Sequence, residues 1–212
     1  MMFTIAVANT KGGAGKTTLA TTLAAHYAGR GLQTALGDLD LQQSSLGWLR
    51  RRPSEVPKIS GVDLEEEGAK PRKKTDVLVV DCVAAMSRDV VKDVVKRADV
   101  IVIPVLPSAF DEDGTRRFIE QLAELKPIRK NKRAVAFVGN RVRLRTKAAE
   151  RLNHFLEDLG FPTVAMLRDT QLFAQAAQNG IAIMELPSRR TYDHVMDLQP
   201  LIDFIEESRL SA

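Results

Sequence analysis

The chain has 212 residues, enough for one α/β domain with a full hydrophobic core and short for two domains. Its 31 lysines and arginines against 27 aspartates and glutamates are compatible with a polyanionic partner without requiring one. One cysteine, Cys82, excludes an internal disulfide and a metal site made of several cysteines, and no apolar run reaches the ~18 to 20 residues that span a bilayer. We therefore expect a single domain over residues 1–212 that is soluble and cytoplasmic.

The segment from Phe3 to Thr18 (FTIAVANTKGGAGKTT) predicts a buried strand, a glycine-rich turn and the start of a helix. Free N–H groups at a helix N-terminus, the helix dipole and a nearby lysine all favour phosphate oxygens. The general P-loop pattern needs a glycine where this chain has Thr10, so the segment is a variant of that pattern. It predicts a nucleotide site, followed by a helix that ends near Gly29.

The octapeptide KGGAGKTT resembles the deviant Walker A motif of the ParA/MinD family of dimerising ATPases. The resemblance implies ATP and Mg²⁺ as cofactors, ATP hydrolysis and an ATP-dependent homodimer. It further implies that Lys16 binds the phosphates of its own nucleotide, that Thr17 supplies a hydroxyl to Mg²⁺, and that Lys11 reaches into the partner subunit's site. The nucleotide-binding residues expected from the motif are Lys11, Gly12, Gly13, Ala14, Gly15, Lys16, Thr17 and Thr18.

The next predicted strand, Leu32 to Asp40 (LQTALGDLD), carries two carboxylates at the end where open α/β sheets place their ligand chemistry. The family has an Asp-x-Asp-Pro-Gln run here, and this chain has DLDLQ. The resemblance implies that Asp40 positions the attacking water and that Asp38 lies near the metal. Leu41 replaces the proline of the family pattern, which leaves the conformation of this turn open. Without the glycine loop upstream, two strand-end carboxylates would be interpreted as helix caps or residues of a solvated turn.

Charged residues and prolines dominate from Arg50 to Thr75, which we interpret as a surface connection. The apolar run that follows, DVLVVD, ends at Asp81 and has the Walker B pattern of a buried parallel strand. Asp81 is expected to hold Mg²⁺ through water, because Mg²⁺ keeps several waters and takes one or two carboxylates. Cys82 and Val83 depart from the small residues usual in the family, so the γ-phosphate-sensing loop is expected to differ. We expect Cys82 itself to be a small buried residue.

Strands and helices continue to alternate to the end of the chain. The run PVLPSAFD after the next strand resembles the corresponding strand exit of the family, and so does the C-terminal third. Asn140 follows a predicted strand, and in related members an asparagine here reads the adenine edge; turn chemistry explains it almost as well. The remaining predicted strands are Asp99 to Val105, Arg133 to Val138, Pro162 to Leu167 and Ile181 to Leu186. The remaining predicted helices are Gln42 to Leu49, Val90 to Ala98, Asp111 to Leu125, Thr146 to Leu159, Gln171 to Asn179 and Leu198 to Ser208.

The segment Lys126 to Arg151 is strongly basic, with Glu150 as its one acid. If its side chains share one surface, they favour nonspecific binding to DNA phosphates, with Arg141, Arg143, Arg145 and Lys147 as the candidate contacts. The other interpretation is a solvated basic face. No helix-turn-helix, zinc finger or aromatic platform accompanies the segment, so sequence-specific readout is not expected.

Together these patterns predict an α/β fold: a mostly parallel twisted sheet with helices on both faces, of the P-loop NTPase type. The expected function is that of a ParA-like, nucleoid-associated ATPase that forms an ATP-bound dimer, binds DNA nonspecifically and positions a plasmid, chromosome or protein complex. A ParB-like or other adaptor would stimulate hydrolysis and reset it.

Other members of the superfamily remain as alternatives. A MinD-type membrane cycler needs a basic amphipathic C-terminal helix, whereas residues 198–212 carry three acids and one arginine. A four-iron cluster needs more cysteines than one per chain. A dethiobiotin-synthase-like enzyme lacks the early lysine, so Lys11 argues against it. A module that holds ATP without turnover is a further alternative, suggested by the unusual residues after Asp40 and Asp81.

Overall fold

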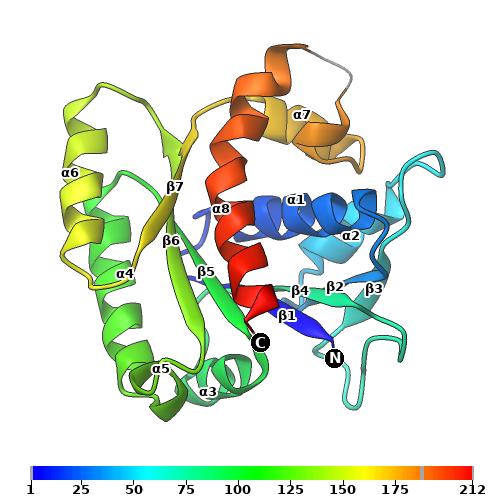
Figure 1. Cartoon of the computed structure of the whole chain (residues 1–212), viewed down its shortest axis with the longest axis horizontal. Helices are drawn as coiled ribbons and strands as arrows, with labels where there is room; N and C mark the ends of the chain where they lie inside the picture. Colours follow the sequence, from blue (N-terminus) through cyan, green and yellow to red (C-terminus); the bar gives the residue numbers. More distant parts are fainter. Residues whose placement is uncertain (1, 187–188, 212) are drawn as a thin grey trace.

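A seven-stranded sheet forms the centre of the computed structural model, which describes residues 2–186 and 189–211 (Figure 1). The strand order is β3-β2-β4-β1-β5-β6-β7, and each neighbouring pair is parallel. The predicted α/β class with a parallel sheet is therefore confirmed. The strands are β1 (Phe3–Val7), β2 (Thr34–Asp38), β3 (Ser60–Asp63), β4 (Val77–Asp81), β5 (Val100–Val105), β6 (Ala134–Val142) and β7 (Thr163–Arg168).

Helices cover both faces of this sheet, as predicted (Figure 1). One core contains residues of α1, α2 and α8, with α7 packed against it, and the other contains residues of α3, α4, α5 and α6. The helices are α1 (Lys16–Gly29), α2 (Ser44–Arg50), α3 (Arg88–Arg97), α4 (Ala109–Ala123), α5 (Lys126–Arg129), α6 (Lys147–Glu157), α7 (Leu172–Gln178) and α8 (Tyr192–Leu210), with 3₁₀ turns η1 (Ile183–Glu185) and η2 (Arg189–Thr191). Among the described residues, none of these helices is long and apolar enough to cross a membrane.

The central strand β1 shows how the sequence builds the two cores. Successive side chains of a strand point to opposite faces. Ile5 and Val7 accordingly lie in the core under α1 and α8, and Ala6 lies in the core under α3 and α4. Because both faces are covered, all five residues of β1 are buried, which explains the continuous apolar run in the sequence.

The segment from Arg50 to Thr75, predicted as a surface connection, contains the edge strand β3. This strand has four residues, and of these only Val62 is buried. So short a strand with one buried side chain gives no periodic signal in the sequence. The crossover from β3 to β4 then runs without a helix, through turns and bends.

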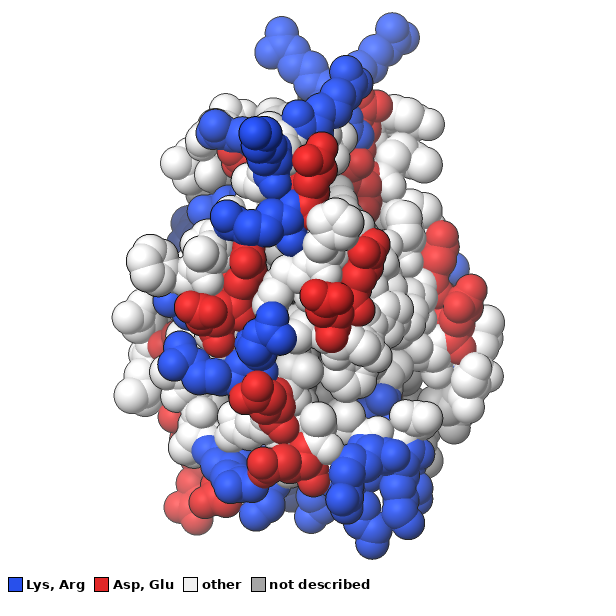
Figure 2. Space-filling model, turned by 90° about the vertical axis from the view of Figure 1, so that its left-hand side faces the viewer, with Lys and Arg blue, Asp and Glu red and all other residues white. Residues whose placement is uncertain are grey.

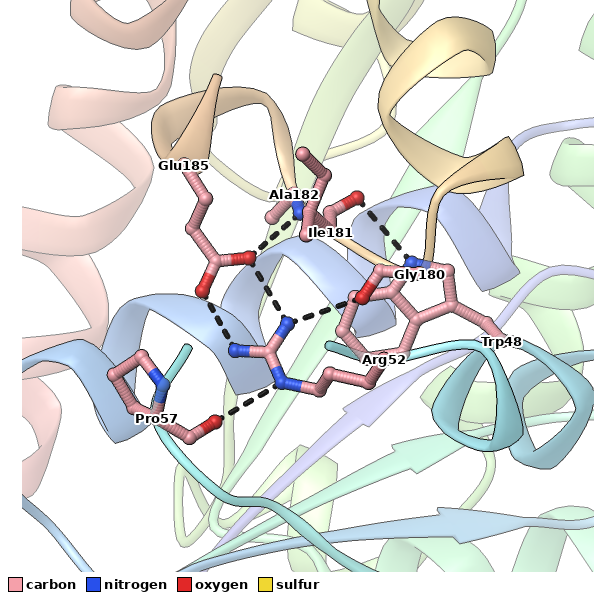
Figure 3. A network of polar contacts seen from close by, with 7 residues as sticks. All are labelled: Trp48, Arg52, Pro57, Gly180, Ile181, Ala182 and Glu185. Carbon is pink, nitrogen blue, oxygen red and sulfur yellow. Dashed lines mark hydrogen bonds and ion pairs between the residues drawn. The ribbon is translucent and has the colours of Figure 1, made fainter. Parts of the chain in front are cut away.

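The predicted strand from Ile181 to Leu186 is wrong, because this segment forms the 3₁₀ turn η1. Glu185 accepts a hydrogen bond from the Ala182 N–H at 2.8 Å and forms an ion pair with Arg52 (Figure 3). These contacts close the segment into a turn. The apolar residues that suggested a strand are explained by Ile183, which is fully buried against the α1 side of the sheet.

Candidate nucleotide site

The glycine-rich loop leaves β1 in the middle of the carboxyl edge of the sheet and leads directly into α1. Gly13 and Gly15 have φ angles of 78° and 97°, in the left-handed region that favours glycine. These two residues turn the chain back so that α1 begins at Lys16. The N-terminus of a fourteen-residue helix therefore faces the loop, as expected for a phosphate site.

Lys16 is 8% exposed, and its Nζ donates a hydrogen bond to the Lys11 carbonyl at 3.1 Å. Burial lowers the pKa of this ammonium, while the nearby Asp81 is the main influence in the opposite direction. A buried lysine with a single backbone acceptor retains donors for an anion, since an ammonium has three. The arrangement supports the predicted phosphate role of Lys16.

Asn140 lies against the loop from the end of β6. Its Nδ2 donates to the Ala14 carbonyl at 2.8 Å, and its Oδ1 accepts the N–H of Arg141 at 3.0 Å. A Cβ added to Gly15 would lie 2.1 Å from that Nδ2, so the close approach also requires glycine there. The amide thus braces the phosphate loop in this structure, and its role in reading adenine stays a prediction.

Asp81 ends β4 directly beside Asp38 at the end of β2. Burial raises the pKa of the Asp81 carboxyl to about 7, with the Thr17 hydroxyl acting in the opposite direction. Its Oδ1 is buried without a hydrogen-bond partner among the described residues. A buried orphan carboxylate oxygen close to a hydroxyl fits a Mg²⁺ ion, which would also satisfy it.

No group of three or more His, Cys, Asp or Glu side chains among the described residues could enclose a metal alone. Asp81 and Thr17 would therefore hold Mg²⁺ together with water and phosphate oxygens, as is usual for this ion. Mg²⁺ bound there would neutralise charge developing on the phosphates.

Asp38 is fully buried and acts inside the protein as an anchor for α2. Its Oδ2 accepts from the Ser45 N–H at 2.9 Å, the Ser45 hydroxyl at 2.7 Å and the Leu46 N–H at 3.2 Å. Its Oδ1 accepts from the Asp40 N–H at 3.0 Å. These bonds satisfy N–H groups in the first turn of α2, which is the helix-cap alternative stated for the strand-end carboxylates, and the role of Asp38 as a metal ligand stays a prediction.

The turn after Asp38 places Asp40 outside β2, so the strand ends two residues before the predicted end at Asp40. Asp40 instead starts a turn in which its carbonyl accepts from Gln43 and its Oδ1 accepts from the Gln42 N–H. Leu41, which replaces the family's proline, is 84% exposed at the tip. The structure thus gives this turn a definite conformation with an apolar side chain facing outward.

Lys11 lies along α4 of its own chain. A Cβ on Gly114 would come within 2.8 Å of its Cγ and Cδ, so this glycine makes room for the lysine stem. The Thr10 hydroxyl donates to the Gly114 carbonyl at 3.2 Å and fixes the same contact. Gly114 was not singled out from the sequence, although a glycine inside a helix, which costs about 1 kcal/mol, is a signal of such a packing need.

Cys82 follows Asp81 and is buried, as predicted. Burial raises the pKa of its thiol above the usual range, so it remains protonated and unreactive.

The basic segment 126–151 does not form one surface. Its two halves lie at opposite ends of β6, a nine-residue strand about 30 Å long at ~3.3 Å per residue. Figure 2 shows Lys and Arg gathered at both ends of this face, with a mixture of acidic and basic side chains between them. Some members are already paired: Arg143 contacts Asp169, and Arg151 contacts Glu112. In the half of the segment at the carboxyl edge, three basic side chains therefore have no ion pair among the described residues: Arg141, Arg145 and Lys147.

Comparison with known proteins agrees with this geometry. A family profile, the CobQ/CobB/MinD/ParA nucleotide binding domain, matches residues 5–183. The maintenance of carboxysome distribution protein A of Halothiobacillus neapolitanus is 28% identical over 194 residues, covering 88% of this chain and 89% of that protein. Protein ParA of Rhizobium radiobacter is 28% identical over 189 residues, covering 86% and 76%.

Among solved structures, one described as a plasmid partition protein of Borrelia burgdorferi bound to AMPPNP superposes with a TM-score of 0.70. It is 15% identical and covers 96% of this chain and 99% of its own, so this likeness concerns the fold. With the profile spanning most of the sequence and the loop, strand order and carboxylates in place, the chain belongs to the CobQ/CobB/MinD/ParA family of nucleotide-binding domains.

Proposed function

We propose that this protein is a ParA-like positioning ATPase. It binds Mg-ATP at the loop after β1, forms a homodimer in that state, binds DNA nonspecifically and carries a cargo. A ParB-like or other adaptor resets it by stimulating hydrolysis. The observation that carries the proposal is the convergence of buried Lys16, the orphan Asp81 oxygen and the Asp40 turn around one helix N-terminus.

The proposed reaction is transfer of the γ-phosphoryl group to water. The bond between the β–γ bridging oxygen and the γ-phosphorus breaks, and a bond forms from the water oxygen to that phosphorus. Lys16 and the α1 N-terminus stabilise the negative charge on the phosphate oxygens. Asp40 accepts a hydrogen bond from the water and orients it for in-line attack. ADP leaves with the bridging oxygen, the phosphate keeps the water oxygen with one of its protons, and the other proton is released to solvent.

The dimer in this proposal depends on Lys11. In this structure its stem lies over Gly114 in the same chain. Crossing to a second subunit would require the side chain to leave α4. Leu41, exposed at the tip of the Asp40 turn, is an apolar contact that a second subunit would cover.

The kinds of cargo that we propose are those for which the relatives are named. Those proteins are named for carboxysome distribution and plasmid partition. A membrane cycle is not proposed, because the apolar side of α8 is already used in the core, with Leu198, Leu201, Ile202 and Ile205 buried.

The test compares the wild-type chain with Asp40→Ala and a control, Asp89→Ala, whose side chain is 95% exposed on α3. Phosphate release is measured with Mg-ATP, with and without random duplex DNA, and the mass in ATP by light scattering. We expect wild-type turnover and dimerisation, a loss of about 100-fold or more in turnover with an ATP-bound dimer for Asp40→Ala, and no change for Asp89→Ala. An Asp40→Ala protein that hydrolyses ATP normally would refute the assigned role, and wild-type protein that binds ATP without turnover would identify a binding module.

A further inference from the structure

A second concave site lies at the opposite edge of the sheet from the nucleotide loop. It is a pocket of about 590 Å³ where β2, β3 and β4 begin, with Thr34, Ser60 and Thr75 in its wall. The α2–β3 connection forms one side, and the helix-free crossover from β3 to β4 forms the other. Its volume lies within the range of roughly 300 to 1,000 Å³ usual for small-molecule sites.

Positive charge distinguishes this pocket. Four exposed cations line it, Lys58, Arg72, Lys73 and Lys74, and no carboxylate is among the described residues that line it. None of the four forms an ion pair within the described part of the chain, although the protein as a whole holds 31 cations and 27 anions. The lining also includes Arg52, whose charge is neutralised by Glu185 at 2.6 Å.

The side of the pocket that carries Lys58 is held in place by Arg52 (Figure 3). The Arg52 guanidinium donates to both oxygens of Glu185 and to the Gly180 carbonyl, and it lies over the Trp48 ring at 5.0 Å. Its Nε also donates to the Pro57 carbonyl at 3.0 Å, next to Lys58. The backbone that presents this cation is therefore tied to the body of the protein.

The other side is fixed by backbone bonds at the start of β4. The Thr75 N–H donates to the Arg72 carbonyl at 3.0 Å, closing a turn around Lys73 and Lys74. The neighbouring Asp76 exchanges two bonds with Gln33, each at 2.8 Å. Both sides of the pocket thus present their cations from backbone that is already fixed before any ligand arrives.

Like charges held close together repel each other, and an anion between them relieves this repulsion. Preformed walls also reduce the entropy lost when a ligand binds. Leu49 and Ile59 add apolar surface to the lining, which suits the organic part of a ligand. A phosphate chain in extended duplex DNA would leave that concave apolar surface unused.

We propose that this pocket binds a small phosphorylated molecule, whose phosphoryl groups lie among Lys58, Arg72, Lys73 and Lys74. The same phosphate chemistry could come from the backbone of DNA, and the experiment separates these two sources. The site is distinct from the nucleotide loop and does not depend on ATP binding there.

The experiment titrates tripolyphosphate into the Lys16→Ala protein, the background in which the nucleotide loop is disabled. Binding is measured by the heat released and by the change in tryptophan fluorescence. Trp48 is the only tryptophan, and it lies beneath Arg52 beside the pocket. The test variant adds Lys73→Gln and Lys74→Gln. Its matched control adds Lys130→Gln and Lys132→Gln, which remove the same charge at the α5 end of the sheet. Circular dichroism and thermal melting check that each variant is folded.

We expect tripolyphosphate to bind the background protein and to bind the pocket variant at least tenfold more weakly, with the control within twofold. A parallel titration uses a short random duplex. Absence of tripolyphosphate binding, or equal weakening in both variants, overturns the proposal. Duplex binding that is lost in the pocket variant, with no tripolyphosphate binding to the background, overturns the small-molecule assignment and gives DNA as the source.

Discussion

The two edges of the same sheet handle positive charge in opposite ways. At the carboxyl edge, Lys16 is buried close to Asp81 and Asp40, so protein carboxylates offset its charge. At the amino edge, the four pocket cations are exposed and have no carboxylate in the pocket lining among the described residues. A buried charge needs partners of its own, whereas an exposed cluster tolerates their absence because water solvates it. The site at the carboxyl edge therefore depends on individual residues, whereas the pocket at the amino edge depends on the combined charge of several cations.

The largest expected effect tests the carboxyl edge. Lys16→Ala removes a partly desolvated cation from the centre of the phosphate site, and buried charge-assisted contacts commonly contribute several kcal/mol. We expect Mg-ATP affinity to fall about 1,000-fold by equilibrium titration. Lys130→Ala removes an equal charge beyond the other end of the sheet and serves as the control, with affinity within twofold. If the two variants bind alike, net charge rather than a specific lysine governs nucleotide binding.

The next largest effect concerns the contacts by which Arg52 holds one wall of the amino-edge pocket, which we call the Arg52 clamp. In the Arg52–Glu185 pair the side chains are 5% and 12% exposed, so Arg52→Ala leaves a largely buried carboxylate without its partner. We expect the free energy of unfolding to fall by about 3 kcal/mol in urea denaturation. The control is Arg88→Ala, whose ion pair with Glu124 is 66% and 60% exposed and should contribute less than about 1 kcal/mol. Equal losses for the two variants would show that Arg52 does not act as a clamp.

Most of the carboxyl edge could be predicted from the sequence, because local patterns carry it. The apolar runs predicted β1, β4 and β5, and the glycine loop predicted a helix directly after it, which α1 forms from Lys16. The contacts of Asn140 with Ala14 and of Lys11 with Gly114 join segments more than 100 residues apart. No local pattern encodes such contacts. Lys11, Ala14 and Asn140 were predicted as site residues, but their contacts, and the part played by Gly114, were therefore not.

The amino edge was harder to predict for the same reason. Its pocket is assembled from three separate segments, residues 33–34, 49–60 and 72–75. In the sequence the basic residues of the last segment resemble any solvated charge cluster. The pairing of the short edge strand β3 with β2, the contacts of Arg52, and the backbone bonds at the start of β4 together bring these cations around one hollow.

The smallest expected effect is on DNA affinity, and it tells which end of β6 carries the basic residues that contact DNA. DNA binding at the nucleotide-site end predicts that changing Arg141, Arg145 and Lys147 together to glutamine weakens binding to random duplex by about three- to tenfold in the presence of Mg-ATP. The slope of log affinity against log salt should fall in magnitude by about 1 to 3, because each lost phosphate contact removes about 0.9 from it. Changing Lys126, Lys130 and Lys132 removes the same charge at the far end and should leave the slope unchanged. Gel-shift titrations across a salt series measure both triples. Equal slopes for the two would mean that DNA responds to the overall charge, and a fall confined to the second triple would place the DNA surface at α5.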